Sequence, residues 1–338
     1  MNSNASLVAA ASDDKDLYLW NRKTGRLLER FTHPSAVLAT AFSPDDQLIA
    51  TGSWDGSARL WDLSGTQQAI LLGHQKAIWD VIFSPDGQTI LTAGADNKIR
   101  LWDRQGTQKA VYSGHTDEIR SKDISQDGQF LLSASLDETV NLWDINGRIM
   151  RIFKGGSGGF LDARFSPDGN LVAATGFDNK IRIWQIESGE LKTVIEGHDE
   201  EVRSVSFNQA GTQIVSAGGD GQVKLWSVEG TLIATLASEG EAAWQALFVK
   251  TTSSEPSVQK QMVIAAGEDK QATLWDLESV LSNRSLIKKS CQWVADYLET
   301  SIQTETDRDL CEAYLAENFT AADSTEAEDF AQTKEAFQ

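Results

Sequence analysis

The sequence predicts an all-β fold built from seven copies of one unit, each a small antiparallel sheet. Tryptophan recurs after Leu or Ile at regular intervals of 41, 41, 41, 41, 42 and 49 residues. Between these tryptophans lie short strands of alternating polarity, separated by Asp- and Gly-containing turns. A unit this small cannot bury its own apolar faces, so the copies must pack on one another. The repeated tryptophans are Trp20, Trp61, Trp102, Trp143, Trp184, Trp226 and Trp275.

The first copy begins in the middle of the unit. Residues 7–12 match the second strand of the unit, residues 16–20 the third, and residues 26–31 the outer strand. The six residues before Leu7 are too few and too polar to form the inner strand. We therefore expect the first sheet to lack its inner strand.

Five complete copies follow. Their inner strands are expected near 36–42, 77–83, 118–124, 159–165 and 201–207. Each inner strand is followed by a short turn, which reads S-P-D-D, S-P-D-G, S-Q-D-G, S-P-D-G and N-Q-A-G in turn. Asp and Gly favour the tight backbone conformations of such hairpins.

The last copy is irregular. Residues 242–249 read as an inner strand, but the polar insertion 250–261 replaces the tight turn and predicts a mobile surface loop. No clear outer strand follows Trp275. We therefore assign residues 1–278 to the repeat domain. Apolar residues at helical spacing, from Ile287 to Leu298, predict a helical C-terminal extension over 279–317, and 318–338 reads as an acidic, disordered tail.

Gly-His early and Trp-Asp late in a unit of this length resemble the WD-repeat family of β-propellers. The resemblance covers residues 7–276 and implies a seven-bladed propeller with four strands in a complete blade. The segments 291–298 (CQWVADYL) and 307–311 (DRDLC) also resemble the tail of cyanobacterial WD-repeat signalling proteins. That resemblance implies a bacterial, regulatory protein. The phosphate-binding motif of the NTPase module found in such proteins does not occur in this sequence.

Composition narrows the class of partner and the compartment. The formal net charge is −19, from 49 acidic and 30 basic residues, which argues against binding to nucleic acid. No apolar run reaches the roughly 20 residues of a membrane helix, and residues 1–6 do not read as a signal peptide. The only cysteines, Cys291 and Cys311, fit free thiols in a reducing compartment, although a disulfide between them is possible. We expect a cytoplasmic protein without a cofactor.

Four copies share a set of polar residues at fixed distances before the repeat Trp. An Asp lies six residues before it, a Ser or Thr ten before it, and a His 28 before it. The family resemblance implies a structural network in which Asp accepts from His, His from the hydroxyl, and the hydroxyl from the indole. A Ser-His-Asp triad is the alternative, but an active site needs one copy, not four. The histidines are also one per blade, too far apart to bind a metal. The sets are His33, Thr51, Asp55 and Trp61; His74, Thr92, Asp96 and Trp102; His115, Ser133, Asp137 and Trp143; and His198, Ser216, Asp220 and Trp226.

A partner site is expected where the inner strands begin. In this family, the position five residues after the His and the position just before the Asp point into the opening at that face. Trp and Arg at these positions are typical of binding hot spots, so we expect a protein or peptide partner. The predicted contact residues are Leu38, Trp54, Trp79, Arg120, Leu161, Phe177, Arg203 and Trp244.

Three functions remain open from the sequence. The favoured one is a non-catalytic interaction scaffold. A propeller hydrolase or lyase with its site at the channel mouth is the second, and a non-functional fragment of a larger WD-repeat protein is the third. The open edge of the incomplete ring could also pair with a strand of another chain or of an upstream domain.

Overall fold

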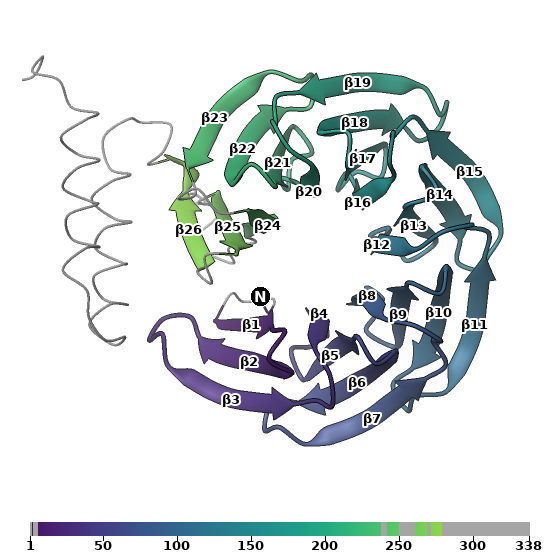
Figure 1. Cartoon of the computed structure of the whole chain (residues 1–338), viewed down its shortest axis with the longest axis vertical. Helices are drawn as coiled ribbons and strands as arrows, with labels where there is room; N and C mark the ends of the chain where they lie inside the picture. The colour runs from purple at the N-terminus through teal and green to yellow at the C-terminus, as the bar shows by residue number, and fades with distance from the viewer. Residues whose placement is uncertain (1, 3–5, 238–241, 250–260, 269–271, 279–338) are drawn as a thin grey trace, which may run out of the picture. The chain divides into compact units, whose positions relative to one another are not determined.

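The computed structural model describes residues 2, 6–237, 242–249, 261–268 and 272–278. These residues form seven antiparallel sheets (Figure 1). The chain divides into two compact units, Met1–Leu281 and Ser282–Gln338, and all described residues belong to the first. The predicted extension 279–317 and tail 318–338 lie outside the described residues, as does the predicted loop 250–261 except for its last residue. No helix in the described ranges is long and apolar enough to span a membrane.

We number the sheets blade 1 to blade 7 in chain order. As described, blades 1 and 7 have three strands each, and the other blades have four. Blade 1 contains β1 (Leu7–Ala11), β2 (Asp16–Asn21) and β3 (Leu27–Thr32). Blade 2 contains β4 (Val37–Phe42), β5 (Leu48–Ser53), β6 (Ser57–Asp62) and β7 (Gln67–Leu72). Blade 3 contains β8 (Ile78–Phe83), β9 (Thr89–Gly94), β10 (Lys98–Asp103) and β11 (Gln108–Ser113).

The remaining blades repeat this order. Blade 4 contains β12 (Ile119–Ile124), β13 (Phe130–Ser135), β14 (Thr139–Asp144) and β15 (Ile149–Lys154). Blade 5 contains β16 (Phe160–Phe165), β17 (Leu171–Gly176), β18 (Lys180–Gln185) and β19 (Leu191–Glu196). Blade 6 contains β20 (Val202–Phe207), β21 (Gln213–Gly218), β22 (Gln222–Ser227) and β23 (Leu232–Ala237). Blade 7 contains β24 (Ala243–Val249), β25 (Met262–Gly267) and β26 (Ala272–Asp276).

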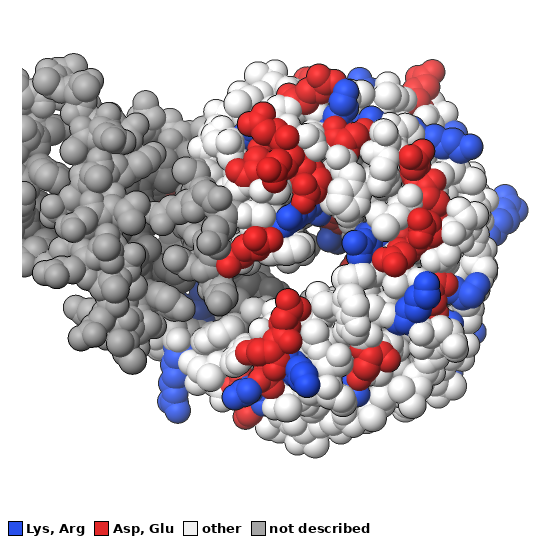
Figure 2. Space-filling view, viewed as in Figure 1, with Lys and Arg blue, Asp and Glu red and all other residues white. Residues whose placement is uncertain are grey.

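The sheets are arranged radially, with the strands of each blade in chain order from the centre outwards (Figure 1). In blades 2 to 7 the first strand of the blade lies at the centre, and Figure 2 shows an opening there. The prediction of a seven-bladed, all-β propeller is confirmed. The five inner strands predicted for the complete copies begin within one residue of their observed starts.

The hydrophobic core lies between blades. Leu60 and Leu71 of blade 2, for example, share a buried cluster with Ile78, Phe83 and Trp102 of blade 3. Equivalent clusters join blades 1 and 2, 3 and 4, 4 and 5, and 5 and 6. Burying one such side chain contributes about 1.5–3 kcal/mol, a gain that each blade obtains only from its neighbour. A single blade therefore cannot bury its apolar side chains, and the blades are stable only when packed on one another.

The turn between the first two strands is fixed by its own residues. In blade 3 the Ser84 hydroxyl donates to Asp86 at 2.5 Å and accepts from the backbone N–H of Thr89 at 3.0 Å. Gly87 follows with a φ of 67°, the left-handed conformation that glycine adopts without strain. These bonds close the hairpin and set the register of the inner strand.

Candidate functional site

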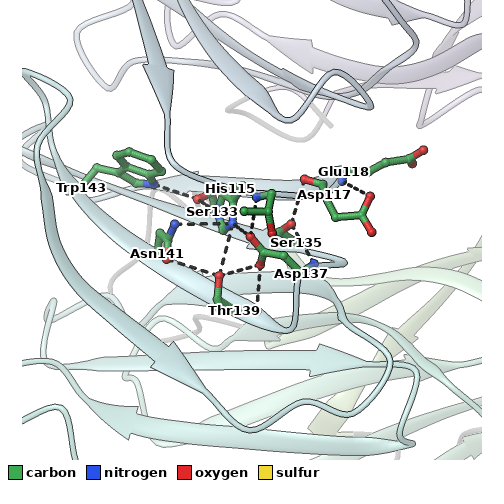
Figure 3. Close-up of polar contacts among 10 residues, drawn as sticks. His115, Asp117, Glu118, Ser133, Ser135, Asp137, Thr139, Asn141 and Trp143 are labelled. Carbon is green, nitrogen blue, oxygen red and sulfur yellow. Dashed lines mark hydrogen bonds and ion pairs between the residues drawn. The ribbon is translucent and has the colours of Figure 1, made fainter.

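The predicted polar network is complete in blade 4 (Figure 3). His115 Nδ1 lies 2.8 Å from Asp137 Oδ2, and His115 Nε2 lies 2.6 Å from Ser133 Oγ. The Trp143 indole N–H donates to the same hydroxyl at 2.8 Å. Asp137 also accepts from the backbone N–H of Thr116 at 3.0 Å. Four segments of one blade are thereby joined through buried polar groups.

The direction of each hydrogen bond follows from the groups involved. An ionised carboxylate only accepts, so His115 Nδ1 carries the proton and Nε2 accepts from the Ser133 hydroxyl. The hydroxyl in turn accepts from Trp143. Each buried donor therefore has an acceptor, which makes the burial of the carboxylate tolerable.

The same network is complete in blades 3 and 6. The His Nδ1 to Asp distances are 2.8 Å for His74 and Asp96, and 2.9 Å for His198 and Asp220. The hydroxyls of Thr92 and Ser216 lie 2.8 and 2.7 Å from Nε2. Their bonds from the indoles of Trp102 and Trp226 measure 2.8 and 2.9 Å.

The pKa shifts of His74, His198 and Asp96 agree with a structural network in which His donates to an ionised Asp. Burial lowers the pKa of His74 and of His198, more than the adjacent carboxylates raise it. Burial raises the pKa of Asp96, but hydrogen bonds from His74 and from the Gln75 backbone, with the charge of Arg100, lower it to about 2. The pair is therefore a neutral imidazole donating to a carboxylate at neutral pH.

Blade 2 departs from the prediction. His33 Nε2 lies 2.9 Å from the Thr51 hydroxyl, which accepts from Trp61 at 3.1 Å, as expected. However, His33 Nδ1 donates to the Phe31 carbonyl at 2.9 Å, and Asp55 instead accepts from Ser57 and Arg59. The predicted bond between His33 and Asp55 is wrong.

The residues on either side of the histidine explain this difference. In blades 3, 4 and 6 the residue after His donates its backbone N–H to the Asp, whereas blade 2 has Pro34, which has no N–H. The residue before His is Gly in those three blades and Thr32 in blade 2. A Cβ at Gly114 would come within 2.8 Å of the Trp143 ring, so a larger residue must move the chain. Blade 2 therefore lacks the backbone donor and the small residue that accompany the His–Asp bond in the other three blades.

Blade 5 fills the place of the histidine in another way. Gly156 stands where blades 2, 3, 4 and 6 have His, and a Cβ there would lie 2.7 Å from the ring of Phe160. Phe160 is fully buried and packs edge-on to Trp184, with ring centroids 5.9 Å apart. Asp178 is held by Arg182, whose guanidinium donates to both carboxylate oxygens at 3.1 and 2.6 Å. The Phe160 ring thus takes the place of the imidazole, whereas the Arg182–Asp178 pair has a counterpart in blade 3, where Arg100 pairs with Asp96.

Sequence reasoning missed a second set of contacts, which joins neighbouring blades along the inner strands. Asp80 accepts from the backbone N–H of Lys122 in the next blade at 3.0 Å. Asp162 accepts from the Val205 N–H at 3.0 Å, and Ser204 from that of Ala246 at 2.9 Å. The signal was a polar residue 22 positions before several of the repeat tryptophans, which the periodicity does not distinguish from a surface position.

A buried lysine belongs to this set. The Lys122 side chain is fully buried, with its Nζ 3.3 Å from Asp80, at a position where the inner strands of blades 2, 3, 5 and 6 carry Thr, Val, Ala and Val. Burial lowers the pKa of Lys122 to about 8, against the opposing effect of Asp80. Burial also raises the pKa of the neighbouring Asp123. Lys122 itself is not open to a ligand, because its side chain is fully buried.

The predicted contact residues form two clusters. In the first, the Arg120 guanidinium lies 4.0 Å from the centre of the Trp79 ring, and Trp79 packs at 90° against Trp54 with centroids 5.5 Å apart. The Trp79 indole donates to Glu118 at 3.0 Å, and Glu118 also pairs with Arg120 at 3.5 Å. Trp54 remains 57% exposed. The cluster therefore presents one free aromatic surface, with a carboxylate nearby.

The second cluster repeats this chemistry. The Arg203 guanidinium lies 4.0 Å from the centre of the Trp244 ring and pairs with Glu201 at 2.8 Å and Glu268 at 3.4 Å. Trp244 remains 54% exposed. Phe177 is exposed as well, while Leu38 and Leu161 are half-buried. The structure thus brings five of the eight predicted contact residues together, as a Trp54–Trp79–Arg120 cluster and an Arg203–Trp244 pair, and leaves the other three separate.

The chain has four histidines, and all four are buried in the blade networks. In the part of the chain that the structure describes, no three His, Cys, Asp or Glu side chains are grouped in a way that could hold a metal ion. The charged groups within the two clusters pair with one another, Arg120 with Glu118 and Arg203 with Glu201.

Comparison with protein families agrees with the fold. The family model described as "WD domain, G-beta repeat" (WD40) matches residues 25–62, 65–103, 106–144, 147–185 and 189–227. The matches cover more than half of the chain, so the protein belongs to the WD40 repeat family. Propellers of this family commonly act as protein-interaction scaffolds and are typically not enzymes. No curated protein matches the chain.

Proposed function

We propose that the protein is a non-catalytic scaffold that binds a protein or peptide segment at the face where its inner strands begin. The observation that carries the proposal is the pair of half-exposed tryptophans, Trp54 and Trp244. Trp54 packs against Trp79, which is itself covered by Arg120, and Trp244 is covered by Arg203. Large exposed aromatic side chains lose little conformational entropy on binding and bury much area, which is why they dominate interaction hot spots.

The alternative of a propeller hydrolase or lyase has less support. Such chemistry usually needs a general base open to substrate, most often a histidine. Each of the four imidazoles is buried, and both of its ring nitrogens already have partners within the blade. We propose further that the scaffold is regulatory and cytoplasmic and that its partner is a protein, since a net charge of −19 opposes nucleic acid.

The test uses the full chain as bait. Wild-type protein and the double variant Trp54→Ala, Trp244→Ala are immobilised and exposed to a lysate of the source organism, and bound proteins are quantified by mass spectrometry. We expect specific partners to be retained by wild type and lost from the double variant. Leu72→Ala, which removes a side chain 71% exposed on an outer strand, is the control and should retain them. Equal capture by wild type and the double variant would contradict the proposal.

A further inference from the structure

Both arginines beside the aromatic clusters are already committed to other groups. Arg120 stacks on Trp79 and pairs with Glu118, and its side chain is only 24% exposed. Arg203 stacks on Trp244, pairs with two glutamates and is 17% exposed. Stacking and ion pairing together fix the guanidiniums and neutralise their charge. An acidic partner would have to displace these carboxylates, so the arginines are not a ready site for one.

The exposed charge on this face is mostly negative, although Lys76 is exposed on the loop that leads into β8. Asp117, Asp199 and Glu200 are exposed on the loops that lead into the inner strands β12 and β20. Glu268, next to Arg203, is itself 48% exposed. On the face drawn in Figure 2, acidic side chains gather in patches around the central opening. A charged partner approaching such a surface is attracted only if it is basic.

Free aromatic faces lie within this negative field. Trp54, Trp244 and Phe177 are 57%, 54% and 44% exposed. A Lys or Arg side chain binds well where it can cover an aromatic ring and reach a carboxylate at once. The protein already contains two such arrangements, in which Arg120 and Arg203 each cover a Trp ring and pair with Glu. An incoming basic side chain would repeat an arrangement that this surface is built to hold.

From these observations we propose that the segment bound at this face is basic, with Lys or Arg side chains that stack on Trp54 or Trp244 and pair with the surrounding carboxylates. The proposal rests on the proposed scaffold function and specifies its partner. Because the attraction is between exposed charges, binding weakens as salt is raised. Acidic or uncharged segments are excluded as the preferred partner.

The probe is a library of random 12-residue peptides displayed on phage and selected on the immobilised full chain. We expect the peptides that bind to be enriched in Lys and Arg over the unselected library, and to lose binding to the variant Trp54→Ala, Trp244→Ala. The triple variant Asp117→Lys, Asp199→Lys, Glu200→Lys should lower their affinity about tenfold or more.

A matched charge reversal separates local from overall charge. Glu187, Glu190 and Glu229 are exposed in turns between the third and outer strands. Their replacement by Lys changes the net charge equally and should leave peptide affinity within about twofold, since charges beyond about 10 Å are screened at 0.1 M salt.

The outcomes distinguish the two proposals. Peptides that depend on Trp54 and Trp244 but show no basic bias, or are rich in Asp and Glu, would overturn the basic segment while leaving the scaffold function standing. Equal loss of affinity in both charge-reversal variants would also overturn it. If no selected peptide depends on the two tryptophans, both proposals fail.

Discussion

Replacing Ser133 with Ala tests whether the blade network stabilises the fold. The change removes one oxygen and leaves two buried groups without partners, the Trp143 indole N–H and His115 Nε2, which lie 2.8 and 2.6 Å from it. An unsatisfied buried polar group costs about 1–3 kcal/mol. We therefore expect Ser133→Ala to lower the free energy of unfolding by about 2–5 kcal/mol.

Ser135→Ala is the matched control. Ser135 lies on the same strand, β13, and is as fully buried as Ser133. Its hydroxyl donates to the Asp117 carbonyl at 3.1 Å and accepts from the Asp137 N–H at 3.1 Å. Asp117 is exposed and Asp137 partly exposed, so water can reach these two partners when the hydroxyl is removed. We expect a loss of about 1 kcal/mol from this variant, the net value of an ordinary hydrogen bond.

The assay is urea unfolding of the full chain, followed by circular dichroism and by tryptophan fluorescence, with the two probes compared to check that unfolding is cooperative. If the two variants lose equal stability, or if Ser133→Ala costs less than about 0.5 kcal/mol, the network is not a significant support of the blade and the reasoning is refuted.

The remaining predictions concern the carboxylates and pH. Asp137→Ala should lower the free energy of unfolding by about 1–2 kcal/mol more than Asp55→Ala does in urea unfolding, because only Asp137 accepts a hydrogen bond from a buried imidazole. Equal losses would contradict the finding that His33 and Asp55 are not bonded in blade 2. Stability should fall as pH drops below about 6.5, because unfolded histidine takes up a proton there while burial holds the pKa of His74 and His198 lower. Asp96, with its pKa lowered from 3.8 to about 2, should add a further loss of about 2 kcal/mol as the pH falls through that range. Thermal midpoints that do not change between pH 7 and 5 would refute the first of these pH effects.

The blades themselves could be predicted from sequence because the repeat Trp and the turn residues recur at fixed spacing. Trp102 and Ile78, for instance, lie 24 residues apart, and the same interval separates the corresponding residues of the other complete blades. Such a pattern fixes strand order and register within a blade. It also placed the His, the hydroxyl and the Asp of blades 3, 4 and 6 together, because their bonds are made within one repeat.

Departures from the pattern were harder to predict because they depend on single residues. Blade 2 lacks the bond between His33 and Asp55, and it differs from blades 3, 4 and 6 in having Thr32 and Pro34 on either side of the histidine. The spacing of the repeat does not take these flanking residues into account. Phe160 fills the space left by Gly156 only because two segments meet in three dimensions. The contact of Asp80 with the Lys122 N–H crosses between blades, and sequence periodicity alone does not indicate which side chains cross.

The state of the imidazoles tests most directly the claim that the repeated His, hydroxyl and Asp residues hold the blades together rather than perform chemistry. Long-range ¹H–¹⁵N correlation spectra of protein labelled on histidine distinguish the two ring nitrogens. The account predicts that Nδ1 carries the proton in all four histidines, because Nδ1 faces a carboxylate or a carbonyl in each. A ring protonated on Nε2, or an imidazolium in fast exchange with solvent, would contradict it.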